Sequence, residues 1–94
     1  MNKIIFQWDE QKNKINQQKH GISFEEAESV FFDDYALQFW DEDHSHEEER
    51  FLLLGISSKM RILIVVHCFR EEDSLIRIIS ARKATKNESQ EYRR

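Results

Sequence analysis

Apolar and polar residues alternate at the start of the chain, and this spacing predicts a short strand from Ile4 to Trp8. Asp9 follows directly and is a favourable N-cap, because its carboxylate can accept from the free backbone N–H groups of a first helical turn. We therefore expect a helix that runs to about Lys19. Gly21 fits the left-handed residue just past such a helix.

A second helix is predicted immediately afterwards. Ser23 and Glu26 have the spacing of a capping box, in which each side chain bonds the backbone N–H of the other residue. The apolar residues that follow lie on one helical face, and they are Phe24, Ala27, Val30 and Phe31. We expect Asp33 and Asp34 to end this helix.

The rest of the chain reads as four strands and a short helix. The strands are expected at Tyr35 to Trp40, Arg50 to Ser57, Arg61 to Arg70 and Leu75 to Arg82. A second capping box, Thr85 with Glu88, opens a last helix that ends near Tyr92, its only large apolar anchor. Connections this short favour antiparallel pairing. The order predicts an α+β fold, with an antiparallel sheet, two N-terminal helices packed on it and a short C-terminal helix.

Composition limits the class of protein. The chain has 94 residues, 39% of them hydrophobic, which suits one domain over residues 1–94 with a small core. Cys68 is the only cysteine and follows an apolar run, so we expect a buried small side chain rather than a reactive thiol. No signal peptide or membrane-spanning run is visible, which favours a cytoplasmic protein without a membrane partner.

Charge is abundant and segregated. Residues of the DEKR set make up 34% of the chain, and the net charge is −4, which argues against non-specific binding to nucleic acid. Acids concentrate in the runs 41–43 and 47–49, whereas bases concentrate at 12–19 and 77–86. A local basic patch therefore remains compatible with the negative total, because salt screens distant charges from one another.

The first helix carries a polar face. Lys12, Asn16 and Lys19 share one side of it, together with Ile15, the only strongly apolar residue of the helix. The lysine stems could lie over the sheet with their ammonium groups in water, or they could form a cationic stripe that binds phosphate. His20 could cap the helix end, or it could act as a general acid or base near neutral pH.

The acidic segment from Asp41 to Glu49 contains His44 and His46. Its side chains are of the metal-ligating types, but the spacing matches no established zinc site. We interpret this segment as a solvated acidic loop that binds no metal, and one that could attract a basic partner.

Three strand arginines are the most informative candidates, namely Arg70, Arg77 and Arg82. Arginine on an apolar strand face is costly unless it is paired. The three could be paired structurally with Glu48, Glu49 or Asp73, or they could form a cluster whose guanidinium forks bind phosphate. Strict alternation places Arg77 and Arg82 on opposite faces of the sheet, so their convergence requires a bulge or an arginine that swings round the strand end.

Three segments together resemble a known family of bacterial toxins, the BrnT family. The segments are Phe6-x-Trp8-Asp9-x-x-Lys12-x-x-x-Asn16-x-x-Lys19-His20-Gly21-Ile22-x-Phe24-x-x-Ala27, then Glu49-Arg50-x-x-x-x-Gly55, then Ile76-Arg77-Ile78-Ile79-Ser80-Ala81-Arg82-x-Ala84-x-x-x-Glu88-x-x-x-Tyr92. They span almost the entire chain in the expected order. Two positions depart from the pattern: Met60 stands where a hairpin glycine is common, which predicts a strained or longer turn, and Ser89 stands where a basic residue is common.

The resemblance implies a RelE-like fold and a toxin of a type II toxin–antitoxin system. It implies a ribonuclease that needs no metal or other cofactor, arrests translation, and is neutralised by a BrnA-like antitoxin, either as a homodimer or in a larger assembly with it. The alternative is a non-catalytic module that binds protein through the same fold. The arginines distinguish the two, because a nuclease needs them in an open groove and a scaffold holds them in buried ion pairs.

The chemistry of RNA cleavage assigns candidate roles at these positions. The nucleophile is the 2′-hydroxyl of the RNA, so the protein must supply an acid, a base and cations. The candidate catalytic residues are Lys12, His20, Glu49, Arg77 and Arg82. The candidate RNA-binding residues are Lys19, Arg50 and Arg70.

Overall fold

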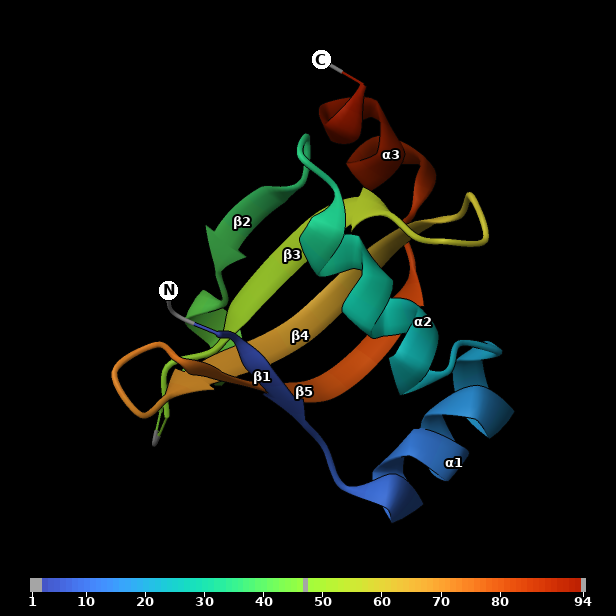
Figure 1. The fold of residues 1–94 in the computed structure, drawn as a ribbon. Helices are drawn as coiled ribbons and strands as arrows, with labels where there is room; N and C mark the ends of the chain where they lie inside the picture. Colours follow the sequence, from blue (N-terminus) through green and yellow to red (C-terminus); the bar gives the residue numbers. More distant parts are fainter. Residues whose placement is uncertain (1–2, 47, 94) are drawn as a thin grey trace.

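A computed structural model describes residues 3–46 and 48–93 of the protein. The strands are β1 (Ile5–Gln7), β2 (Leu37–Trp40), β3 (Phe51–Ile56), β4 (Ile62–Arg70) and β5 (Leu75–Lys83). The helices are α1 (Glu10–His20), α2 (Phe24–Ser29) and α3 (Lys86–Tyr92), with short 3₁₀ turns η1 (Val30–Phe32) and η2 (Glu42–His44). The strands form one sheet in the order β1-β5-β4-β3-β2 (Figure 1). The α+β class predicted from the sequence is confirmed.

One strand pair departs from the predicted antiparallel sheet. β2, β3, β4 and β5 pair antiparallel in succession, as expected from their short connections. β1 instead pairs parallel with β5, with Ile5 opposite Leu75 and Gln7 opposite Arg77. No hairpin constrains the direction of β1, because the chain leaves it into α1 and reaches the opposite edge of the sheet through α2 (Figure 1).

The main core lies between α2 and one face of the sheet. Its fully or nearly fully buried members come from α2, the preceding loop, η1 and the three central strands, and they are Ile22, Phe24, Ala27, Val30, Leu53, Leu63, Val65, Ile78 and Ala81. Phe6 and Trp8, which flank the end of β1, pack against it. This face is the apolar side that the alternating strand pattern predicts.

α1 docks on the body through amides rather than through an apolar stripe. Asn13 and Asn16 are 1% and 5% exposed, whereas Ile15 is 45% exposed. The side of the helix on which the sequence placed Lys12, Ile15, Asn16 and Lys19 therefore does not pack on the body as a unit, since of these four only Asn16 is buried. Asn16 Nδ2 donates to the Ala81 carbonyl at 2.8 Å, and Asn16 Oδ1 accepts from the Ala81 N–H at 3.1 Å. The side chain therefore pairs with β5 as a neighbouring strand would, beyond the point where β1 ends.

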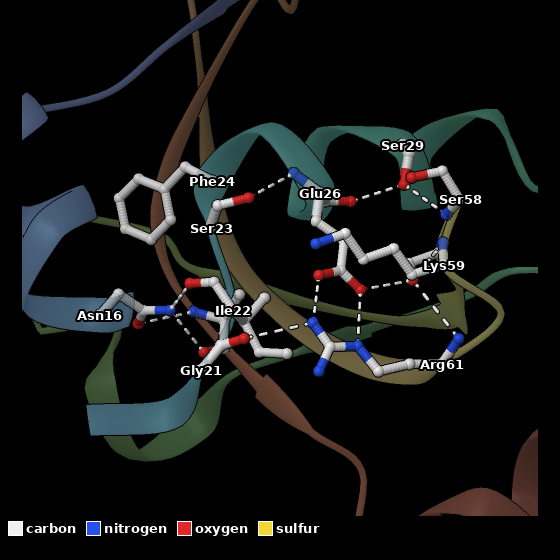
Figure 2. A network of polar contacts seen from close by, with 12 residues as sticks. Asn16, Gly21, Ile22, Ser23, Phe24, Glu26, Ser29, Ser58, Lys59 and Arg61 are labelled. Carbon is white, nitrogen blue, oxygen red and sulfur yellow. Dashed lines mark hydrogen bonds and ion pairs between the residues drawn. The ribbon is translucent and has the colours of Figure 1, made fainter. Parts of the chain in front are cut away.

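Only one of the two hydrogen bonds of the predicted Ser23 capping box forms, and the Glu26 side chain makes a longer-range contact instead (Figure 2). Ser23 Oγ accepts from the Glu26 N–H at 3.1 Å, as predicted. The Glu26 carboxylate instead forms an ion pair with Arg61 and accepts from Ser57 Oγ at 2.7 Å. Burial acts to raise the pKa of Glu26, but the hydrogen bonds from Arg61 and Ser57 hold it below its ordinary value. Arg61 also reaches the Gly21 carbonyl at 3.2 Å and so ties the end of α1 to the β3–β4 hairpin.

Two features of β4 and its hairpin follow from the sequence. Met60 has a φ of 61°, which accords with the strained turn expected where glycine is common. Cys68 is fully buried, and burial raises the pKa of its thiol, as expected for a structural rather than a reactive cysteine. His67 is also fully buried, against Phe31, Phe51 and Phe69, and this burial lowers the pKa of its imidazole.

Within the described part of the chain, no helix is long and apolar enough to cross a membrane.

Candidate nucleic-acid interface and active site

A β-bulge brings the two β5 arginines to the same face of the sheet. Ser80 lies opposite Val66, but Ile78 lies opposite His67, so Ile79 is an extra residue in β5. The bulge reverses the alternation between Arg77 and Arg82. Arg77 lies opposite Cys68 of β4, and Arg82 lies opposite Ile64. Both arginines therefore share the face of Ser80, which is the face of the sheet opposite the core. Of the two routes to convergence that the sequence left open, a bulge or an arginine that swings round the strand end, the structure has the bulge.

A hollow of about 320 Å³ lies on this face, and we call it the arginine hollow. Its floor is the row Leu52, Val66 and Ser80, which are paired across three adjacent strands. Its walls are Arg82 from β5, Arg50 at the start of β3, and Asp41, Asp43 and His44 from the loop after β2. Two guanidinium groups, two carboxylates and an imidazole thus line one open surface above a floor of two apolar side chains and the Ser80 hydroxyl.

Arg82 is held in the wall by α3. Its Nη1 and Nη2 atoms donate to the two Glu88 carboxylate oxygens at 2.8 and 3.0 Å. Glu88 also accepts from the Thr85 N–H, which completes the predicted capping box of α3. The hydrogen bonds from Arg82 lower the pKa of Glu88 to about 2. Arg82 therefore keeps a fixed position while its side chain is 39% exposed to solvent.

The far end of α3 is anchored as well. The Tyr92 hydroxyl donates to Asp33 Oδ2 at 2.6 Å, and this bond raises the pKa of Tyr92 to about 12. The sequence predicts Tyr92 as an apolar anchor. Its hydroxyl is the group that fixes it, on an aspartate 59 positions earlier in the chain.

The other strand arginines have separate partners on the same face. Arg77 Nη1 donates to Gln7 Oε1 of β1 at 3.0 Å. Arg70 forms an ion pair with Glu48, one of the partners foreseen in the structural interpretation. Both arginine side chains remain partly open to solvent, so neither is held in a buried structural pair.

The remaining candidate residues lie outside the arginine hollow. Glu49 lines a different hollow, of about 620 Å³, with Phe51 and Phe69. Lys12, Lys19 and His20 are exposed on α1. Of the acidic run 47–49, Glu47 lies outside the described residues. Of the candidate residues, the structure therefore brings Arg50 and Arg82 together in the arginine hollow, whereas the three α1 residues do not line it.

Sequence reasoning missed an ordered His–Asp pair in the wall. His44 Nδ1 lies 3.1 Å from Asp41 Oδ2 and 3.2 Å from Asp41 Oδ1. The spacing i, i+3 in a 3₁₀ turn could have signalled this contact, but the acidic run favoured a solvated loop. Among the described residues, no group of three or more His, Cys, Asp or Glu side chains is arranged to hold a metal ion.

Comparison with known proteins identifies the family. Residues 8–88 match the family model described as the ribonuclease toxin BrnT of type II toxin–antitoxin systems. The crystal structure of the Brucella abortus ribonuclease toxin BrnT is similar at a TM-score of 0.65 and 26% sequence identity, over 92% of this chain and 100% of that one. The curated proteins provided no match. The chain therefore belongs to the BrnT family of ribonuclease toxins of type II toxin–antitoxin systems.

Proposed function

We propose that the protein is a metal-independent endoribonuclease that cuts RNA at the arginine hollow and so arrests translation. The observation that carries the proposal is the convergence of Arg82 and Arg50 on one open hollow of the sheet. Guanidinium groups match the oxygens of a phosphate in geometry and charge. An RNA strand that runs from the arginine hollow toward the β4–β5 turn would meet Arg77 and then Arg70, which extend from β5 and β4 on the same face.

The cleavage chemistry assigns a role to each part of this surface. The 2′-hydroxyl attacks the adjacent phosphorus, and negative charge accumulates on the phosphorane oxygens. Arg82 is placed to stabilise that charge, and Arg77 is the other arginine of β5 on the same face. Arg50 and Arg70 would position phosphates. Lys12, Lys19 and His20 are exposed on α1 and Glu49 lines the second hollow, so none of these four residues lies at the proposed cleavage site.

The alternative is a binding module without catalysis. The ion pairs of Arg82 with Glu88 and of Arg70 with Glu48 favour it, because they satisfy both guanidinium groups within the protein. Both pairs are partly exposed, however, and exposed pairs are worth at most about 1 kcal/mol. A phosphate therefore competes with Glu88 at little cost, which is why we prefer the nuclease.

The direct test is cleavage of an end-labelled single-stranded RNA by the purified protein in EDTA. We expect fragments that end in 2′,3′-cyclic phosphate and 5′-hydroxyl, because the internal 2′-oxygen is the nucleophile. A matched oligonucleotide with 2′-deoxy sugars should remain intact. Cleavage that requires added magnesium or zinc, or cleavage of the deoxy control, would contradict the mechanism, and binding of RNA without any cleavage would favour the alternative.

We further propose that the partner is a BrnA-like antitoxin encoded beside this gene. The family is described as a toxin of type II toxin–antitoxin systems, which implies an antitoxin partner. β2 supports a protein partner, since it is an edge strand whose residues Leu37, Phe39 and Trp40 are all exposed. Exposed acidic residues on both sides of β2, Asp34 before it and Glu42 and Asp43 after it, favour a basic partner over a second copy of this acidic chain.

Co-expression with the neighbouring gene tests this partner. The two products should co-elute in size-exclusion chromatography at micromolar concentration, and the complex should cleave RNA more slowly than the free protein. Separate elution would exclude a tight complex, and co-elution with full cleavage activity would exclude neutralisation by occlusion.

A further inference from the structure

The imidazole of His44 is held by a buried carboxylate and remains open to solvent. Both oxygens of Asp41 lie within 3.2 Å of His44 Nδ1. Asp41 is 8% exposed, whereas the His44 side chain is 67% exposed. A carboxylate can only accept hydrogen bonds, so it selects the tautomer that carries the proton on Nδ1. In the neutral ring, Nε2 is then the acceptor nitrogen, and the side chain that carries it is largely exposed.

The loop that carries the pair is closed by its own hydrogen bonds. Ser45 Oγ donates to the Asp41 carbonyl at 2.6 Å and accepts from the Arg50 N–H at 3.0 Å. The Asp41 N–H donates to the Arg50 carbonyl at 2.9 Å and extends the β2–β3 ladder by one bond. These contacts fix Asp41 at the end of the sheet, and Asp41 in turn fixes His44 beside Arg50 and Arg82 in the arginine hollow.

We propose that His44 is the general base of RNA cleavage and that Asp41 is its positioning residue. The assignment rests on the proposed ribonuclease function and adds to it a residue outside the catalytic candidates that the sequence suggests. Removal of a proton from a 2′-hydroxyl next to a bound phosphate requires an exposed acceptor nitrogen beside cationic groups, and His44 lies beside two guanidinium groups in the arginine hollow. Arg82 and Arg50 would hold that phosphate.

The step balances without a further reactant. His44 Nε2 takes the proton of the 2′-hydroxyl while the 2′-oxygen forms a bond to phosphorus. The bond from phosphorus to the 5′-oxygen breaks, and that oxygen takes a proton from water. The imidazolium returns its proton to solvent, so the products are a 2′,3′-cyclic phosphate and a 5′-hydroxyl, with no net consumption of water.

The other histidines fit this role less well. His67 is fully buried, and its two ring nitrogens lie 3.1 Å from the Val65 carbonyl and Gln38 Oε1. His20 lies on α1 and does not line the arginine hollow. His46 shares an adjoining hollow with His44, Glu48 and Arg50, but it does not line the arginine hollow, and no hydrogen bond in the described part of the chain orients its ring.

The test compares His44→Ala with His46→Ala on a single-stranded RNA that the unsubstituted protein cleaves. We expect His44→Ala to lower kcat by roughly 10²- to 10³-fold, and His46→Ala to leave kcat unchanged. The Kd for the 2′-deoxy analogue of the same strand should change by less than about threefold in His44→Ala, because a base acts in the transition state and not in binding. Free imidazole should restore part of the lost rate.

The pH profile and Asp41→Asn provide independent readouts. The pH profile of kcat for the unsubstituted protein should show an acid limb, and His44→Ala should lose this limb. The charged groups that face His44 are Asp41, Asp43, Arg50 and Arg82 in the arginine hollow and His46 and Glu48 beside it. Asp41→Asn should lower kcat without loss of fold, because an amide no longer selects the Nδ1–H tautomer.

The outcomes separate the assignment from the proposed function. Cleavage by the unsubstituted protein that is undiminished in His44→Ala would overturn the general base and leave the ribonuclease intact. Equal losses of cleavage and of binding to the deoxy analogue would also overturn it, since His44 would then be a binding residue. Absence of cleavage by the unsubstituted protein would overturn the proposed function and this assignment together.

Discussion

Replacement of Arg82 by Ala should lower kcat/KM for RNA cleavage by about 10²- to 10³-fold, the usual cost of removing one fixed group that stabilises transition-state charge. Arg82 is the only one of the three strand arginines that lines the arginine hollow. Its planar fork already has a set orientation, because Glu88 holds both Nη atoms. Little reorganisation is then needed when a phosphorane replaces the carboxylate.

The fold should tolerate this change. The Arg82–Glu88 pair is partly exposed, with side chains 39% and 31% accessible, so screening by solvent limits its contribution to about 1 kcal/mol or less. Glu88 would still cap α3 through the Thr85 N–H. Thermal unfolding should therefore shift only slightly while cleavage is nearly lost.

Glu88→Gln is the matched control for Arg82→Ala. It breaks the same ion pair and keeps an oxygen that can accept from Thr85, but it leaves the guanidinium in the arginine hollow. We expect cleavage by Glu88→Gln to stay within a few-fold of that of the unsubstituted protein, because the loss of the fixed guanidinium orientation and the removal of the competing carboxylate act in opposite directions. If both variants lose activity equally, the pair matters only for the position of α3, and the direct role of Arg82 is wrong.

The parts of the fold that depend on neighbouring residues could be predicted from the sequence. Asp9 accepts from the N–H groups of Gln11 and Lys12, and Gly21 adopts the left-handed conformation with a φ of 70°. Thr85 and Glu88 form the complete capping box. Each contact spans at most three residues, so the residue types and their spacing are sufficient to specify it.

The parts that depend on distant residues could not be predicted. Glu26 had two possible partners, the nearby N–H of Ser23 and the guanidinium of Arg61, and the charged partner 35 positions away prevails. The direction of β1 and the bulge at Ile79 likewise follow from how the whole sheet assembles. The alternation of apolar and polar residues indicates which face of the sheet a side chain lies on only as far as a bulge, beyond which the two faces are exchanged.

The candidate site shows the same division. The strand arginines were identified because a cation on an apolar strand is conspicuous. The His44–Asp41 pair was overlooked because its loop is rich in acids, and most acidic loops are solvated. What distinguishes this loop is the Ser45 hydroxyl, which bonds the Asp41 carbonyl and the Arg50 N–H at once. That arrangement is visible only once the ends of β2 and β3 are seen side by side.

Asn16→Ala should destabilise the fold by about 3 kcal/mol, more than Arg82→Ala or Glu88→Gln. Asn16 is almost fully buried, and its amide bonds the Ile22 carbonyl at 2.8 Å as well as the N–H and carbonyl of Ala81. Removal of the amide leaves three backbone groups without these partners, and an unsatisfied buried polar group costs about 1 to 3 kcal/mol. Water that enters the space left by the amide reduces the total cost for the three groups, and so does the better helix propensity of alanine.

The measurement is thermal and denaturant unfolding of Asn16→Ala beside Gln18→Ala, an exposed position on the same helix. We expect the midpoint of Asn16→Ala to fall by about 15 °C, at roughly 4 to 8 °C for each kcal/mol in a domain of this size. Gln18→Ala should match the unsubstituted protein. α1 contributes no large buried apolar side chain, so the Asn16 amide is the group expected to hold this helix to the sheet. If Asn16→Ala lowers the free energy of unfolding by less than about 1 kcal/mol, the amide does not hold it.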